Sequence, residues 1–157
     1  AMKRGLTLFA AAASLAAGFA APDAGTVPIR ICDRLEEAAP PGGGPALLVF
    51  ISTECPVCYE DLFEARYLVD RGRWPVTVVG VAGGRREDLR IFLEKHAWTG
   101  PVVLDRRRVL SRRYDADTAP FKVLLVGRDV AYRDDPYRAP EERREELERC
   151  LTRLFSR

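Results

Sequence analysis

The chain has 157 residues, enough for one domain with a hydrophobic core. Hydrophobic residues make up 47% and charged residues 31% of the chain, which excludes a largely disordered protein. Two of its 25 lysines and arginines, Lys3 and Arg4, lie near the N-terminus, and the rest balance the 23 acidic residues. Because acids are also interleaved among the arginine clusters, the charge pattern argues against a nucleic-acid partner.

The N-terminal segment has the pattern of a secretory signal peptide. Lys3 and Arg4 precede an alanine-rich apolar run, and small residues follow it. A basic start, an apolar middle and a small-residue end are the three parts of such a signal. We therefore predict a signal peptide at 1–21, a folded domain at 22–157, and a periplasmic or cell-envelope location. The alternative is an uncleaved membrane anchor, for which the apolar run is short.

Strands and helices alternate along the rest of the chain. Apolar runs predict strands at 27–31, 46–51, 76–82, 101–105, 121–126 and 130–132. Helical spacing predicts helices at 33–39, 56–72, 86–97, 109–114 and from Pro140 onward, the last with Leu147, Cys150, Leu151 and Leu154 on its apolar face. Alternation followed by a hairpin and a closing helix predicts an α/β sandwich, with a mixed central sheet flanked by helices.

Two cysteines, Cys55 and Cys58, stand where the strand 46–51 gives way to a helix. With two residues between them in a first helical turn, their sulfurs can form a disulfide, and the helix N-terminus favours a thiolate. Pro56 supports a helix beginning there, because proline at the first helical position loses no hydrogen bond. The pair therefore predicts a redox-active thiol site. A static disulfide that only staples a loop is the structural alternative.

Acidic residues surround the pair. Glu54, Glu60 and Asp61 bring negative charge near Cys55, and like charge disfavours a thiolate. The helix terminus acts in the opposite direction. We therefore predict the poise of a reductant or an isomerase in preference to that of a strong oxidant.

The other two cysteines, Cys32 and Cys150, are far apart in the sequence. In an oxidising compartment they could form a bridge that closes a long loop. Equally, Cys150 lies on the apolar face of the last predicted helix, where a buried free thiol is expected. The spacing leaves both interpretations open.

Three motifs in this order resemble the thioredoxin fold, and within it the exported TlpA-like and redoxin branch of thiol-disulfide oxidoreductases. The first is the strand, Cys55-Pro56-Val57-Cys58 and the following helix. The second is Val103-Leu104-Asp105 with Tyr114 a little later, and the third is Thr118-Ala119-Pro120-Phe121 leading into an apolar strand. The resemblance covers roughly 27–155.

The resemblance implies roles for further residues. Pro120 would be a cis-proline facing the disulfide, and the backbone of Ala119 would pair with a bound peptide as an added strand. Asp61 would assist proton transfer, although a first-turn acid complementing the helix dipole is an equal alternative. Two departures stand out: Glu54 occupies a place where the fold often has tryptophan, and Val49 one where thioredoxin has a buried aspartate.

These features predict an exported thiol-disulfide oxidoreductase. Cys55 would be the attacking thiolate and Cys58 the resolving thiol, and Asp61 or Glu60 would accept the Cys58 proton. The expected partners are protein thiols and disulfides, with a membrane electron donor as a candidate source of electrons. We predict a monomer without a cofactor or a metal ion.

Two other functions remain open. A peroxiredoxin-like peroxidase would need a loop in which Ser52 fits the hydroxyl position, but Leu48 replaces the expected proline. A metal-delivery module could hold Cu(I) on the two thiolates of Cys55 and Cys58. His96, the single histidine, is the candidate third ligand for that module, although we expect it to be a surface residue without a catalytic role.

Overall fold

The structure is a computed structural model, and it describes residues 28–40 and 42–156. The predicted signal peptide at 1–21 lies outside the described residues. Within the described ranges, none of the helices has the length and apolar character needed to cross a membrane.

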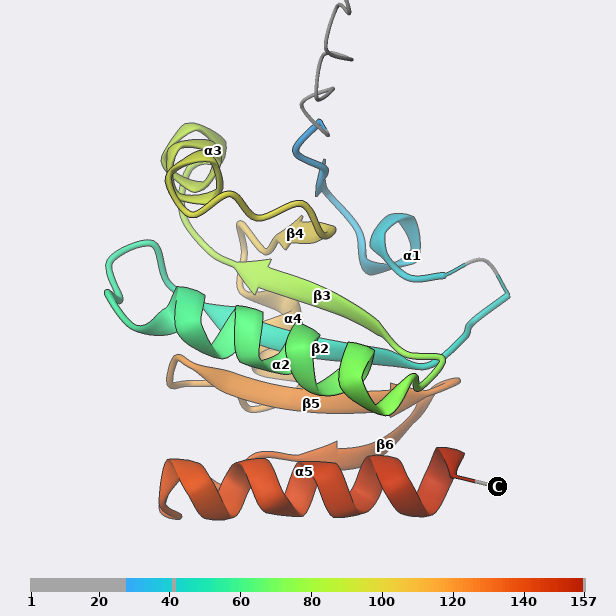
Figure 1. The fold of residues 1–157 in the computed structure, drawn as a ribbon. Helices are drawn as coiled ribbons and strands as arrows, with labels where there is room; N and C mark the ends of the chain where they lie inside the picture. Colours follow the sequence, from blue (N-terminus) through green and yellow to red (C-terminus); the bar gives the residue numbers. More distant parts are fainter. Residues whose placement is uncertain (1–27, 41, 157) are drawn as a thin grey trace, which may run out of the picture.

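Six strands form one mixed sheet in the order β1-β4-β3-β2-β5-β6 (Figure 1). They are β1 (Ile31–Cys32), β2 (Ala46–Ile51), β3 (Thr77–Ala82), β4 (Val102–Leu104), β5 (Phe121–Val126) and β6 (Asp129–Arg133). The inner strand β2 pairs parallel with β3 and antiparallel with β5. The mixed sheet predicted from the sequence is confirmed.

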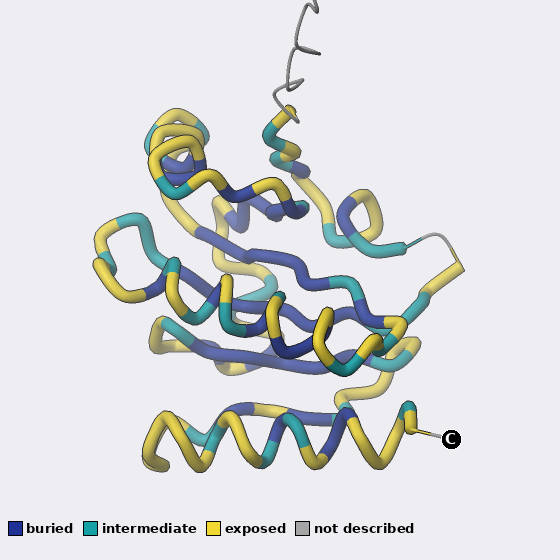
Figure 2. Tube along the Cα trace, in the orientation of Figure 1, coloured by how far each residue is buried: buried dark blue, intermediate teal, exposed yellow. Residues whose placement is uncertain are grey.

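Helices cover both faces of this sheet, which gives two hydrophobic cores. The helices are α1 (Leu35–Ala38), α2 (Cys58–Gly72), α3 (Arg86–Lys95), α4 (Val109–Arg113) and α5 (Pro140–Phe155). On one face α2, α3 and α5 contribute buried leucines, and on the other α1 and α4 contribute apolar side chains. Figure 2 shows the result as buried strands between helices that are exposed on their outer sides.

The register of the central strands brings two distant segments together. All six residues of β2 are buried, because both of its faces are covered. In the antiparallel pairing with β5, Phe50 lies opposite Phe121. The end of β2, which leads into Cys55, therefore lies beside the beginning of β5, which follows Pro120.

Several element ends differ from the sequence prediction. The first strand, predicted at 27–31, is β1 at Ile31–Cys32, because only these two residues pair with β4. Helix α2 begins at Cys58 and not at Pro56, because the chain first makes a turn in which the Cys58 N–H donates to the Cys55 carbonyl at 3.3 Å. In α5, Leu154 is 42% exposed, since Phe155 packs against the core in the last turn instead.

Candidate redox site

The redox pair is present as a disulfide between Cys55 and Cys58, whose Cα atoms are 5.5 Å apart. The two sulfurs differ in accessibility. Cys58 is fully buried at the start of α2, whereas Cys55 in the preceding turn is half-buried and Val57 between them is exposed. An incoming thiol can therefore reach the Cys55 side of the disulfide more easily than the Cys58 side.

The segment that carries Pro120 lies at the same end of the sheet. The peptide bond between Ala119 and Pro120 is cis. Pro120 is half-buried and Ala119 is exposed, so the backbone before β5 is open to solvent. This end of the molecule thus holds both the disulfide and the exposed cis-peptide segment, because the end of β2 lies beside the start of β5.

Asp61 does not stand alone beside the pair, because it forms an ion pair with Lys122 of β5. The Lys122 side chain is 8% exposed and that of Asp61 23% exposed. Lys122 lies opposite Val49 in the sheet. The buried charged side chain beneath α2 is therefore a lysine from β5, and not an aspartate from β2 as in thioredoxin. A lysine this deeply buried requires a compensating partner, and Asp61, one turn after Cys58, provides it.

A buried hydrogen-bond network centred on Asp134 and Arg143 links the start of β5, around Lys122, to α5. The fully buried Asp134 carboxylate accepts bonds from the Lys122 backbone N–H at 2.9 Å, the Tyr132 hydroxyl at 2.7 Å and the Arg143 guanidinium at 2.8 Å. Arg143 also donates to the Pro120 carbonyl at 3.4 Å. The network links the cis-peptide segment to α5, and so fixes where β5 begins.

Sequence analysis missed Lys122, Asp134 and Arg143. A signal for Lys122 was present, because it is the one polar residue in the otherwise apolar strand 121–126. Asp134 and Arg143 lie in a loop and in a charged helix, where acids and arginines are usual, so nothing in the pattern distinguished them.

The buried Tyr132 hydroxyl in this network should make the free energy of unfolding depend on pH in alkaline solution. Burial, then the hydrogen bond to Asp134, raises the pKa of Tyr132 well above its ordinary value. Above about pH 10 the unfolded chain releases this phenol proton while the folded chain keeps it. The free energy of unfolding should therefore fall with rising pH, by up to about 1.4 kcal/mol per pH unit from this group.

Urea unfolding of wild type and Tyr132→Phe between pH 8 and 11 measures this effect. The Phe variant should lose part of the alkaline slope. Tyr137→Phe is the matched control, because Tyr137 is 96% exposed and its removal should leave the slope unchanged. Equal slopes in wild type and Tyr132→Phe would contradict the assignment.

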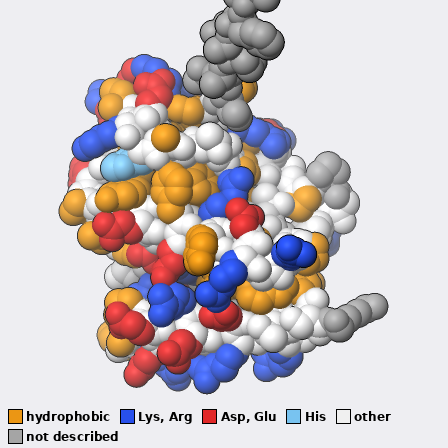
Figure 3. Space-filling model, viewed as in Figure 1, with side chains coloured by type: hydrophobic (Ala, Val, Ile, Leu, Met, Phe, Trp, Pro, Cys, Tyr) orange, Lys and Arg blue, Asp and Glu red, His pale blue; other side chains and the backbone are white. Residues whose placement is uncertain are grey.

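An aromatic cluster borders the pair along the outer side of α2. Tyr59 stacks on His96, with ring centroids 4.1 Å apart, and Phe63 meets Trp98 edge-on at 5.3 Å. Figure 3 shows hydrophobic side chains gathered on this face of the molecule. His96 is thus a packing partner of the residue that follows Cys58. Across the described residues, no group of three or more His, Cys, Asp and Glu side chains is arranged to hold a metal ion.

Cys32 and Cys150 are both free and buried. They belong to different cores on opposite faces of the sheet. Cys32 lies in the edge strand β1, and Cys150 lies in α5, where its thiol contacts the Ala131 carbonyl of the other edge strand, β6. The bridge that the sequence left open is therefore absent, and the free-thiol interpretation is correct.

Comparison with known proteins gives a family and a fold. The AhpC/TSA family model matches residues 17–135, whereas no curated protein matches the chain. Similar solved structures include StoA from Bacillus subtilis (22% identity, 69% of this chain and 82% of that one, TM-score 0.54). A secreted Mycobacterium tuberculosis disulfide oxidoreductase homologous to E. coli DsbE has 23% identity, with 71% and 83% covered and a TM-score of 0.54. A Chlorobium tepidum protein proposed as the thiol:disulfide interchange protein DsbE has 20% identity, with 71% and 79% covered and a TM-score of 0.60. The chain therefore belongs to the AhpC/TSA family and has a thioredoxin fold with a Cys-x-x-Cys disulfide at the head of α2.

Proposed function

We propose that this protein is an exported thiol-disulfide oxidoreductase that exchanges disulfides with protein partners through Cys55 and Cys58. The observation that carries the proposal is the unequal burial of the two sulfurs. The half-buried Cys55 can meet a partner, and the fully buried Cys58 can only attack from within. The exported relative from Mycobacterium tuberculosis and the signal-peptide pattern support an envelope location.

The exchange proceeds in two balanced steps from the reduced pair. The Cys55 thiolate attacks one sulfur of a partner disulfide, a mixed disulfide forms, and the partner's other sulfur leaves as a thiolate that takes up a proton. Cys58 then loses its proton to Asp61 and attacks the Cys55 sulfur. The partner departs as a dithiol with two electrons, and the Cys55 to Cys58 disulfide remains for an electron donor to reduce.

Partner binding is assigned to the segment of Ala119 and Pro120. Its exposed backbone lies at the same sheet end as the disulfide, and an extended partner peptide can pair with it as an added strand. This mode of binding relies mainly on hydrogen bonds between backbone groups. It therefore suits a protein partner better than a small molecule.

The charges favour a reductant or isomerase poise. Glu54 and Glu60 are exposed near Cys55 and form no ion pair within the described part of the chain, so their charge opposes formation of a thiolate. Asp61 contributes less to this field than the sequence suggested, because Lys122 balances its charge. The carboxylates of Glu54 and Glu60 therefore oppose the stabilisation that the dipole of α2 gives to a Cys55 thiolate.

Trapping in cells tests the proposal. With Cys58→Ala in the full-length chain, the second step is blocked, so mixed disulfides on Cys55 should accumulate in the cell envelope. The Cys55→Ser/Cys58→Ala double variant is the matched control and should trap nothing. Alkylation of wild type should find the pair mostly reduced if the protein donates electrons. Absence of any Cys55-linked protein, or its accumulation only in the cytoplasm, would refute the proposal.

A further inference from the structure

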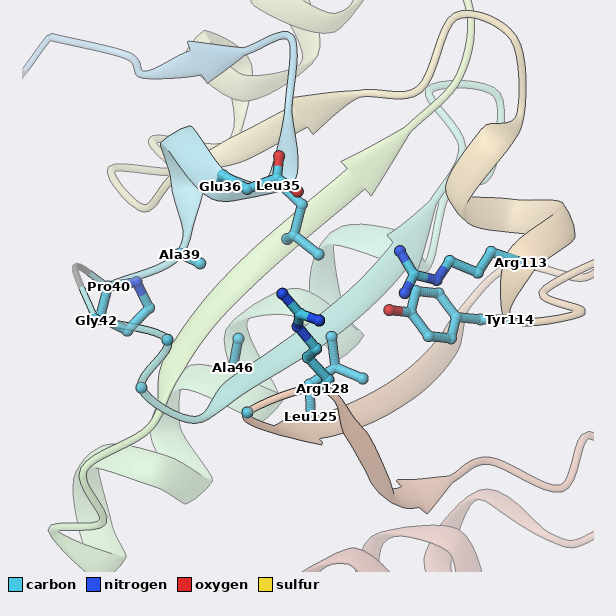
Figure 4. A pocket seen from close by; sticks show the side chains of 13 residues that line it. Leu35, Glu36, Ala39, Pro40, Gly42, Ala46, Arg113, Tyr114, Leu125 and Arg128 are labelled. Atoms are coloured by element: carbon cyan, nitrogen blue, oxygen red, sulfur yellow. The ribbon is translucent and has the colours of Figure 1, made fainter.

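A cavity of about 530 Å³ lies at the end of the sheet opposite the redox pair. It is lined by α1, by Pro40 and residues 42–44 of the following loop, by the start of β2, by the end of α4 and by the turn between β5 and β6 (Figure 4). Ala46 at the start of β2 lines the cavity, whereas the end of β2 leads toward the disulfide. The volume is in the range of small-molecule sites in proteins.

The lining has an apolar part and a cationic part. Leu35, Ala46 and Leu125 form apolar walls, while Arg113 and Arg128 bring two guanidinium groups. Neither arginine forms an ion pair with any described residue, in contrast to Arg133, which is paired with Asp115. Among the described lining residues Glu36 is the only acid, so these residues carry an excess of positive charge.

Tyr114 points to a ligand independently of the arginines. The residue is only 9% exposed, and its ring packs edge-on against Phe50 in the core. In Figure 4 its hydroxyl points into the cavity, and within the described ranges it has no hydrogen-bond partner. The Arg113 guanidinium lies over the same ring, 5.5 Å from its centroid. The hydroxyl lies in the cavity beside the two arginines and has no acceptor among the described residues, and a bound anion would supply one.

We propose that this cavity binds a small organic anion with an apolar body. Its carboxylate or phosphate group accepts hydrogen bonds from Arg113, Arg128 and the Tyr114 hydroxyl. Its apolar body packs against the leucine and alanine walls. This binding site is separate from the redox pair and does not depend on the function proposed for it.

Calorimetric titration of the full-length protein with octanoate, octyl phosphate and octan-1-ol tests the site. At least one of the two anions should bind at least about tenfold more tightly than the alcohol, and their order identifies the preferred head group. Arg128→Gln should weaken anion binding about tenfold, and Tyr114→Phe should weaken it severalfold. Glu36→Gln should leave anion binding as tight or strengthen it.

Arg112→Gln is the matched control, because Arg112 is exposed on the same helix and does not line the cavity. This variant should bind the anion as wild type does, and disulfide exchange should be unchanged in it and in Arg128→Gln. Arg128 is exposed, so its replacement does not threaten folding. Equal binding of alcohol and anions, equal losses in Arg112→Gln and Arg128→Gln, or no binding of any probe at millimolar concentration would each overturn the proposal.

Discussion

Replacing Cys55 with serine should lower the rate of disulfide exchange by a factor of at least about 10³. In the proposed mechanism the partner becomes covalently attached to the Cys55 sulfur, and a serine hydroxyl does not attack a disulfide. Cys58 cannot replace Cys55 as the attacking thiol, because it is fully buried, whereas Cys55 is half-buried. Reduction of insulin disulfides in the presence of dithiothreitol measures the rate.

Serine variants of the other three cysteines test whether the loss of exchange is specific to Cys55. Cys58→Ser should still form the mixed disulfide but release the partner slowly. Cys32→Ser and Cys150→Ser should retain wild-type exchange, since both thiols are buried in cores away from the pair. Exchange that survives in Cys55→Ser, or that is lost equally in Cys32→Ser, would contradict the assignment of the attacking thiol.

The same variants distinguish exchange from peroxide reduction. The Ser52 hydroxyl accepts a hydrogen bond from the Glu54 N–H at 3.2 Å, and Leu48 is fully buried in β2. Position 48 is therefore part of the sheet and not of a peroxide-binding loop. We expect little Cys55-dependent consumption of hydrogen peroxide. Rapid peroxide consumption without insulin reduction would favour the peroxidase alternative.

The central strands could be predicted from the sequence almost to the residue. In β2 and β5 long apolar runs are buried on both faces, so the sequence signal is strong and its ends coincide with the strand ends. The start of α2 could not be placed as well. Pro56 is compatible with a first helical turn, but the turn that positions Cys55 and Cys58 precedes the helix. Local propensity does not encode that geometry.

The site was predictable only as far as its contacts are local. Cys55, Cys58 and Asp61 follow one another within two turns, so their grouping can be read directly from the sequence. The partner of Asp61 is 61 residues away, and it is identified only by the register of β5 against β2. Whether Cys32 and Cys150 can pair depends in the same way on distant contacts, since Cys32 lies in the edge strand β1 and Cys150 in α5, beside the other edge strand β6.

Lys122→Met should destabilise the protein by about 3 kcal/mol at pH 7. Methionine fills a similar volume, but it leaves the Asp61 carboxylate, 23% exposed, without its cation. Urea unfolding at pH 7 measures the loss.

The double variant Lys122→Met/Asp61→Asn shows whether the loss comes from the ion pair. Asp61→Asn alone should also destabilise, since it leaves the buried ammonium unpaired, whereas the double variant should recover most of the loss. Additive losses would show that packing, and not charge compensation, accounts for the effect.

The same variants test whether Asp61 serves the redox pair. If it accepts the Cys58 proton, Asp61→Asn should slow release of the mixed disulfide by about tenfold while leaving the first attack by Cys55 unchanged. A purely structural ion pair would change stability and leave both steps alone. Burying a lysine beneath α2 carries a desolvation cost that an apolar residue would avoid. Selective slowing of the release step would show that the ion pair serves catalysis in return for this cost.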